Sequence, residues 1–184
     1  MIRQNLILYH CNDFFRCHRF VHTEDYMIVS KEDGNWLGTG MYFWDNLANA
    51  EFWMRKKNRK EPYKNYSIVA AEIYLDQLLD LTDINVCNKI GRLWEEYQKK
   101  NVINDAKEYG LGYKLNILFQ SIPFFRDNFY VTKVYGKYNN TPKNKLWTYN
   151  VRGNRAEPTA SVKCIYCVRN QAAIGEKEMK GSEK

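Results

Sequence analysis

Apolar positions along the chain fall into two patterns, short runs typical of strands and stripes at helical spacing. Short runs at 5–11 and 66–75 predict buried strands, and the second is nearly continuous and rich in β-branched residues. Strand character returns in three later stretches, two of which alternate apolar and polar side chains. Strands are therefore expected to crowd toward the C-terminal half, at 129–135, 146–151 and 162–168.

Helical spacing occurs between these runs. Residues 85–100 place their apolar side chains on one stripe and their charges on the other. Apolar residues in 14–22 fall three and four apart, and Asp45 is placed to cap a helix from about Asn46 to Lys57. The segment 114–122 fits a helix and a strand equally well. The mixed order, with no internal repeat or linker, predicts an α+β fold.

Length and composition suit one globular domain. The chain has 184 residues, of which 45% are hydrophobic and 15% aromatic, enough for a single core. We expect this domain to cover residues 1–175 and a polar tail to cover 176–184.

No apolar run approaches the roughly twenty residues needed to cross a bilayer, and the first apolar stretch is too short for a secretory signal. No membrane partner and a cytoplasmic location are therefore expected. Five irregularly spaced cysteines indicate reduced thiols.

The charge is basic and uneven. Lys and Arg outnumber Asp and Glu by 28 to 21, a net +7, and the excess concentrates in RKKNRK at 55–60. Such a cluster can meet the phosphates of a nucleotide or of a nucleic acid. The alternative is a solvated helix end, because basic runs often serve only solubility.

The stretch WLGTGMYFWDN at 36–46 raises a question of ligand binding. Gly38 and Gly40 could let the backbone approach a ligand closely, and Tyr42 could then offer its ring face to a planar cation. Trp53 lies eleven residues after Tyr42, about three turns into the expected helix, and could close over the same space. The alternative is an ordinary buried strand whose aromatic run belongs to the core.

Two motifs carry a resemblance to a known family. His10 at the end of the first expected strand, followed by GTGMYFWDNLANAEFW at 38–53, resembles the catalytic domain of poly(ADP-ribose) polymerases and diphtheria-toxin-like ADP-ribosyltransferases. That family has a His-Gly-Thr/Ser motif, a Gly-x-Gly-Ile-Tyr-Phe-Ala-Asp motif and a glutamate before a late strand. Met41 replaces the isoleucine, and Trp44 is found in small bacterial members. The resemblance implies the ADP-ribosyltransferase fold, with split mixed β-sheets and flanking helices.

The resemblance also implies roles in binding NAD, which this family uses as a substrate. His10 would hydrogen-bond the adenosine ribose, the backbone of Cys11 would hold the nicotinamide carboxamide, and Tyr42 and Trp53 would stack on the nicotinamide ring. Cys11 and Asn12 replace the family's glycine and its threonine or serine; Asn12 can still donate and accept hydrogen bonds. The implied NAD-binding residues are His10, Cys11, Asn12, Gly40, Tyr42 and Trp53.

A catalytic carboxylate is expected because cleavage of the nicotinamide–ribose bond passes through an oxocarbenium-like state. A carboxylate near the developing positive charge stabilises that state. Glu157 is the only carboxylate between Asp127 and Glu176, and it precedes the late strand expected at 162–168. It completes the expected catalytic set with His10 and Tyr42. The alternative assigns Glu157 to a surface turn.

These expectations describe a mono-ADP-ribosyltransferase, by analogy an intracellular bacterial or phage-defence toxin with a possible antitoxin partner. The net charge and the run at 55–60 favour a nucleic-acid acceptor over a protein acceptor. A rival hypothesis is a catalytically inactive module that binds NAD or ADP-ribose and does not use Glu157.

A third hypothesis is a zinc-stabilised nucleic-acid-binding domain. Cys11, Cys17, His18 and His22 lie within twelve residues, and the two histidines are four apart, so they could share a helical face. The expectation is nevertheless that these side chains are buried or incidental and that no metal is bound, because Cys11 falls at the end of a strand.

Overall fold

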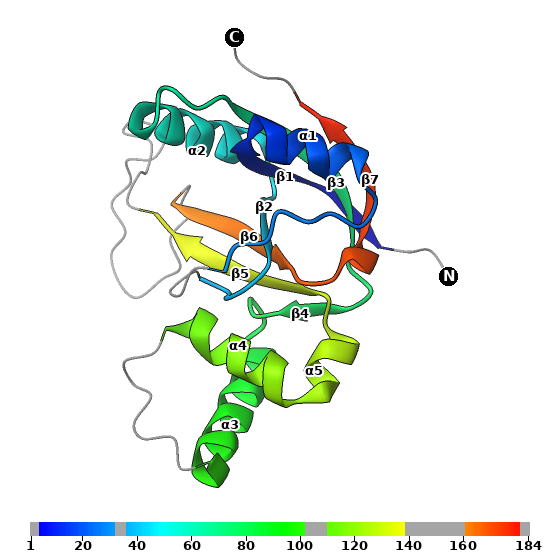
Figure 1. The fold of residues 1–184 in the computed structure, drawn as a ribbon. Helices are drawn as coiled ribbons and strands as arrows, with labels where there is room; N and C mark the ends of the chain where they lie inside the picture. The colour runs from blue at the N-terminus through cyan, green and yellow to red at the C-terminus, as the bar shows by residue number, and fades with distance from the viewer. Residues whose placement is uncertain (1–3, 32–35, 102–109, 139–160, 181–184) are drawn as a thin grey trace.

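A computed structural model describes residues 4–31, 36–101, 110–138 and 161–180. In this part of the chain seven strands form one sheet in the order β4-β5-β6-β2-β1-β3-β7 (Figure 1). Neighbouring strands are antiparallel except β4 and β5, which are parallel. The strands are β1 (Asn5–Asp13), β2 (Met41–Trp44), β3 (Tyr66–Tyr74), β4 (Leu78–Asp80), β5 (Val131–Lys137), β6 (Val162–Val168) and β7 (Ile174–Met179).

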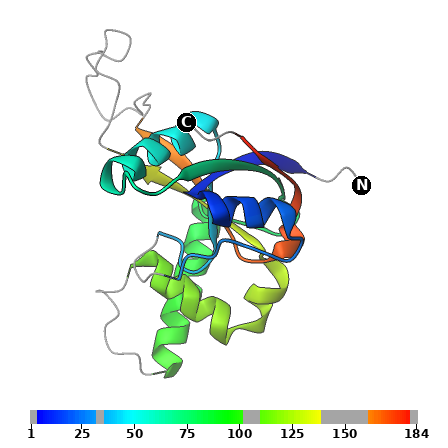
Figure 2. The same cartoon turned by 45° about the horizontal axis from the view of Figure 1, so that its top comes forward.

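The helices gather at the two ends of this sheet. Figures 1 and 2 both show α1 and α2 beside β1 and β3, and α3, α4 and α5 together beside β4. The described helices are α1 (Phe14–His22), α2 (Leu47–Lys60), α3 (Ile84–Asn101), α4 (Leu111–Ser121), α5 (Pro123–Asn128) and the short 3-10 helix η3 (Gln171–Ala173).

The α+β class is confirmed, and so are most of the expected elements. The ambiguous segment 114–122 belongs to helix α4, and the strand expected at 146–151 lies outside the described residues. The strands form one sheet, not separate sheets, but β1 and β2 are paired at a single position. The resemblance implies split sheets, whereas the described strands form one sheet with a weakly paired junction between β1 and β2.

Two expectations about element ends were wrong. Asn46, not Asp45, caps α2, because its side-chain oxygen accepts from the backbone N–H of Asn49 at 3.0 Å. Residues 176–179 of the expected polar tail belong instead to strand β7, which pairs with β3, and residues 181–184 lie outside the described part of the chain. Glu176 and Glu178 are exposed, whereas Lys177 and Met179 are partly buried, and this alternation suits an edge strand with one face in water.

Three cores hold the helices against the sheet. On one face, Met41 and Phe43 of β2 pack with Cys17 and Phe20 of α1. The opposite face carries two separate cores, one beneath α4 and one beneath α2. Because side chains alternate along β2, Tyr42 and Trp44 face the side with two cores. The cavity described below is lined by Tyr42 and Trp44 together with residues of the core beneath α2.

Gly38 and Gly40 are required by packing. Gly38 has φ +80°, and a Cβ there would overlap Asn116 Oδ1 and lie 2.5 Å from the carbonyl oxygen of Gly112, both on α4. A Cβ on Gly40 would meet the thiol of Cys167 and lie 2.7 Å from the carbonyl oxygen of Val168, both on β6. The two glycines therefore let the chain approach α4 and β6 closely. This close packing explains the glycine at position 40 without a ligand.

Within the described residues, no helix combines the length and the apolar character needed to cross a membrane.

Substituting Gly38 with alanine should destabilise the fold by about 2–4 kcal/mol, because it adds left-handed backbone strain to a steric clash. Gly91→Ala is the matched control. Gly91 lies inside α3, and a Cβ added there would meet nothing within 4 Å, so alanine should stabilise the helix by about 0.5–1 kcal/mol. Urea unfolding of both variants checks the difference in sign, and equal midpoints would contradict this explanation of Gly38.

Candidate functional site

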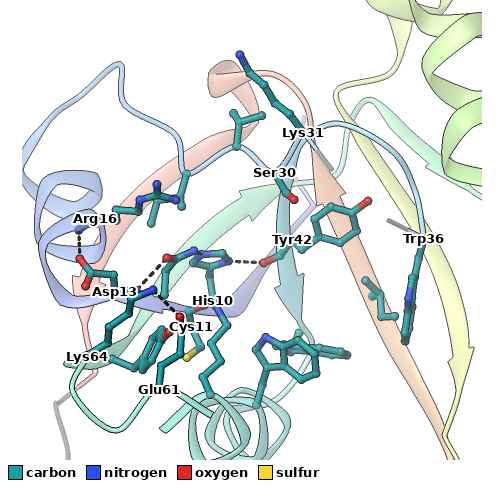
Figure 3. Close-up of a pocket in the computed structure, with 18 of the residues that line it drawn as sticks. His10, Cys11, Asp13, Arg16, Ser30, Lys31, Trp36, Tyr42, Glu61 and Lys64 are labelled. Carbon is teal, nitrogen blue, oxygen red and sulfur yellow. Dashed lines mark hydrogen bonds and ion pairs between the residues drawn. The ribbon is translucent and has the colours of Figure 1, made fainter. Parts of the chain in front are cut away.

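The sheet opens between β1 and β2. β1 pairs with β3 over its whole length, whereas it pairs with β2 only where Tyr9 faces Trp44. One residue further along, the His10 ring replaces the backbone pairing, because its Nδ1 lies 2.6 Å from the backbone oxygen of Tyr42. A side chain therefore joins the two strands where a backbone ladder would otherwise continue (Figure 3).

The hydrogen bonds of His10 define its protonation. A carbonyl oxygen can only accept, so Nδ1 carries the proton, and Nε2 accepts from the amide of Asn12 at 3.3 Å. Burial lowers the pKa of His10 to about 4; the bond to Tyr42 opposes this shift, and the Lys57 ammonium adds to it. His10 is therefore neutral at pH 7, with Nε2 able to accept a hydrogen bond and unable to donate one.

A cavity of about 780 Å³ lies at this opening. Its walls come from β1, α1, the segment 28–31, β2, α2, the start of β3 and the middle of β6, together with Trp36, the turn at 61–64 and Tyr138 directly after β5. Figure 3 shows residues of several of these elements around it. Five of the seven residues predicted to form the site line this one cavity: His10, Cys11, Asn12, Tyr42 and Trp53. Gly40 is not among the lining residues, and Glu157 lies outside the described residues.

The Tyr42 ring is held in place by its hydroxyl. The hydroxyl accepts from the backbone N–H of Leu37 at 3.0 Å and donates to the backbone oxygen of Gly38 at 2.6 Å. Burial is the main cause that raises the pKa of Tyr42 above its ordinary value. Figure 3 shows the ring pointing away from His10. Trp53 has its ring contact with Trp44, at 6.5 Å between centroids, and it lines the same cavity as Tyr42.

Cys11 presents its backbone to the opening and its side chain to the core. The bond from Phe14 N–H to the Asn65 oxygen sets the alternation of the β1–β3 ladder, so the backbone groups of Cys11 point toward β2. The Cys11 oxygen accepts from Lys57 Nζ at 3.4 Å. Its thiol packs beneath α2 beside Met54, and burial raises its pKa to about 11. The Cys11 side chain therefore lies in this core, while its backbone faces the opening between β1 and β2.

The carboxylates that line the cavity already have structural partners. Asp13 caps α1 by accepting from the backbone N–H groups of Phe15 at 3.0 Å and Arg16 at 3.4 Å. Glu61 accepts from Lys64 Nζ at 2.7 Å and from the Tyr66 hydroxyl. The lining contribution of β6 is apolar, the side chain of Ile165. Each described acidic side chain that lines the cavity therefore already has a hydrogen-bond or ion-pair partner.

The structure does not bring the four candidate zinc ligands together. Cys17 of α1 lies in the core, and its thiol donates to the backbone oxygens of Asn12 at 3.5 Å and Ser67 at 3.4 Å. Cys11 belongs to a different core. His18 and His22 do share a helical face, with ring centroids 4.2 Å apart. Across the described ranges, no three metal-ligating side chains come together.

The sequence did not single out several aromatic and basic residues of the cavity. Trp36 and Tyr138 line the cavity but follow no periodic pattern, and the sequence offers a buried core position as one alternative for Trp44. In the sequence Lys57 is only one member of a basic run. In the structure its Nζ donates to the backbone oxygen of Cys11 and lies 5.2 Å from the centre of the Tyr66 ring. The density of tryptophan around residues 36–53 was the available signal.

Comparison with known proteins gives one distant relative. The chain is 24% identical to an uncharacterized protein of the archaeon Methanocaldococcus jannaschii, over 97% of this chain and 89% of that protein. No protein-family model matches the chain. No solved structure matches it either.

His10 should make stability depend on pH. Its pKa is lower in the folded protein than its ordinary value of 6.5, so the unfolded chain binds the extra proton and stability falls as pH drops from about 6.5 toward 4. Between pH 7 and pH 4.5 the wild type should lose about 2–3 kcal/mol more than His10→Gln. Urea unfolding at both pH values measures the loss, and parallel losses in the two proteins would contradict the neutral buried imidazole.

Proposed function

We propose that this protein is an NAD-dependent mono-ADP-ribosyltransferase with the ADP-ribosyltransferase fold. The observation that carries the proposal is the cavity at the β1–β2 opening, which gathers five of the residues that the resemblance assigns to NAD. They come from β1, β2 and α2, separate parts of the sequence, and the weak pairing at Tyr9 and Trp44 leaves room between the strands for a ligand.

The described groups suit the parts of NAD. His10 Nε2 can accept a hydrogen bond from a ribose hydroxyl once the Asn12 amide moves aside. The backbone groups of Cys11 point toward the opening, where they can pair with the carboxamide of nicotinamide. Trp53 offers a ring for stacking on the pyridinium, and Arg16 and Lys57 line the same cavity as cations for the pyrophosphate.

The reaction breaks the bond between ribose C1′ and the nicotinamide nitrogen. The bonding electron pair leaves with nicotinamide, which becomes neutral, while a nucleophilic oxygen or nitrogen of the acceptor bonds to C1′ and releases its proton. A carboxylate stabilises the positive charge that develops on the ribose. Glu157 is the proposed carboxylate, and its role stays a prediction from the sequence, as do the toxin role, the antitoxin partner and the cellular location.

A second function is favoured by a specific observation. The cavity-lining carboxylates Asp13 and Glu61 are engaged by the α1 N-terminus and by Lys64 and Tyr66, and β6 contributes Ile165. A protein with this lining and no further carboxylate would bind NAD or ADP-ribose without cleaving it. The two functions differ in one measurable product, free nicotinamide.

Release of nicotinamide from NAD should be detectable by chromatography with purified protein, alone or with a cell lysate that supplies acceptors. Trp53→Ala should raise KM for NAD about five- to thirty-fold, because it removes one ring–cation stack. Glu157→Gln should lower kcat by about 100-fold or more with KM little changed. Tyr63→Ala is the matched control, since this ring is 80% exposed and lies outside the cavity.

The outcomes separate the two functions. NAD binding by calorimetry without nicotinamide release would favour the binding module over the enzyme. Full activity in Glu157→Gln would reject this carboxylate and keep the enzyme. Absence of both binding and release would contradict both functions.

A further inference from the structure

Four aromatic side chains form a continuous line along the cavity. Trp53 contacts Trp44 at 6.5 Å between ring centroids, Trp44 contacts Tyr138 at 6.0 Å, and Tyr138 contacts Trp36 at 5.2 Å. All four line the same cavity. The line runs from α2, across β2, to the end of β5. The NAD interpretation assigns only Trp53, so three rings remain without a role in it.

Trp36, at the far end of this line, is held in a defined position by close packing. Trp36 lies against the backbone of β5, so closely that a Cβ on Gly136 would overlap the indole ring and lie 2.9 Å from Ile165 Cδ1. The Tyr138 ring contacts the Trp36 ring. Yet Trp36 remains 43% exposed. The fold therefore fixes the orientation of a large apolar ring while leaving much of it in water, which packing alone does not explain.

Cations accompany the rings. Lys56 is exposed, and its Nζ lies 5.0 Å from the centre of the Trp53 ring. Four other basic residues line the cavity itself, against two carboxylates, of which Asp13 caps α1 and Glu61 pairs with Lys64, one of the four. These basic residues are Arg16, Lys31, Lys57 and Lys64.

Rings and cations in this arrangement match one class of partner. Nucleic-acid strands bind where bases can stack on aromatic side chains while cations follow the phosphates. A duplex keeps its bases stacked on one another, so only a single strand can offer their faces to Trp36 or Trp53. The basic end of α2 also complements the helix dipole, but that role needs no exposed tryptophan at the other side of the cavity.

We infer that the aromatic line Trp53–Trp44–Tyr138–Trp36 binds a single-stranded nucleic acid, and that this strand is the acceptor of ADP-ribose. The acceptor role rests on the proposed function. The binding role does not, because it needs neither NAD nor a catalytic carboxylate. A base stacked on Trp36 would lie in the same cavity as the residues assigned to NAD, which is the arrangement that transfer between two substrates requires.

Fluorescence anisotropy with fluorescein-labelled oligonucleotides of roughly twenty nucleotides tests the binding role without NAD. Single-stranded DNA and single-stranded RNA form two arms, and duplexes of the same sequence form the third. Both the wild type and Trp36→Phe should bind single strands in preference to duplexes. Trp36→Ala should bind about ten-fold more weakly, through loss of one base–ring stack. Lys56→Gln should lower the slope of log affinity against log salt by about 0.7, one phosphate contact on a single strand.

Phe15→Ala is the matched control, because this ring is 77% exposed on α1 and does not line the cavity. It should bind like the wild type. Equal affinity for duplexes, or unchanged affinity in Trp36→Ala, would overturn the proposal. Nicotinamide release from NAD, measured with and without the single strands, tests the proposed function separately: binding of the strands without release in either case would keep the binding site and remove the acceptor role. Label from NAD that enters only nuclease-resistant protein would also overturn the acceptor assignment.

Discussion

The hydrogen bond from the His10 ring to the Tyr42 carbonyl is the constraint on which the site depends. It satisfies a backbone acceptor of β2 at the position where the ladder with β1 stops. Without such a donor, an open junction between two central strands would leave that acceptor unpaired next to the core. A charged ring could donate the same bond, but burial keeps the ring neutral by lowering the pKa of His10, so that Nε2 stays an acceptor. One side chain thus permits the sheet to open and fixes which ring nitrogen faces the cavity.

A second set of bonds holds the chain that leads into β2. Asn116 accepts from the backbone N–H of Thr39 at 2.7 Å and from Arg169 at 3.3 Å. Arg169 also donates to the backbone oxygen of Leu37 and lies 4.0 Å from the centre of the Phe119 ring. The Tyr42 hydroxyl bonds to the same short segment. Helix α4 and strand β6 therefore determine where Tyr42 lies, although neither belongs to the motif that drew attention to it.

Local patterns predicted the elements whose signal is contained in a few neighbouring residues. The apolar runs of β1 and β3 and the spacing in α3 are of this kind, and so is the placement of His10 and Tyr42 at strand positions. Strand β4 was missed because three residues carry no periodicity, and β7 because an edge strand tolerates charge. The aromatic line could not be predicted, since Trp36 and Tyr138 meet only through tertiary contacts. Likewise, the two glycines near Tyr42 suggested a ligand, whereas the structure shows that they make room for α4 and β6.

Three of the five tryptophans in the chain, Trp36, Trp44 and Trp53, line one cavity. Indole emission responds to solvent access and to rings stacked on it, so the emission of these three tryptophans reports on the occupancy of that cavity. Trp94, by contrast, is buried among the helices α3 and α4 and supplies a nearly constant background. The protein therefore carries its own optical sensor of ligand binding, built from the side chains that make the cavity.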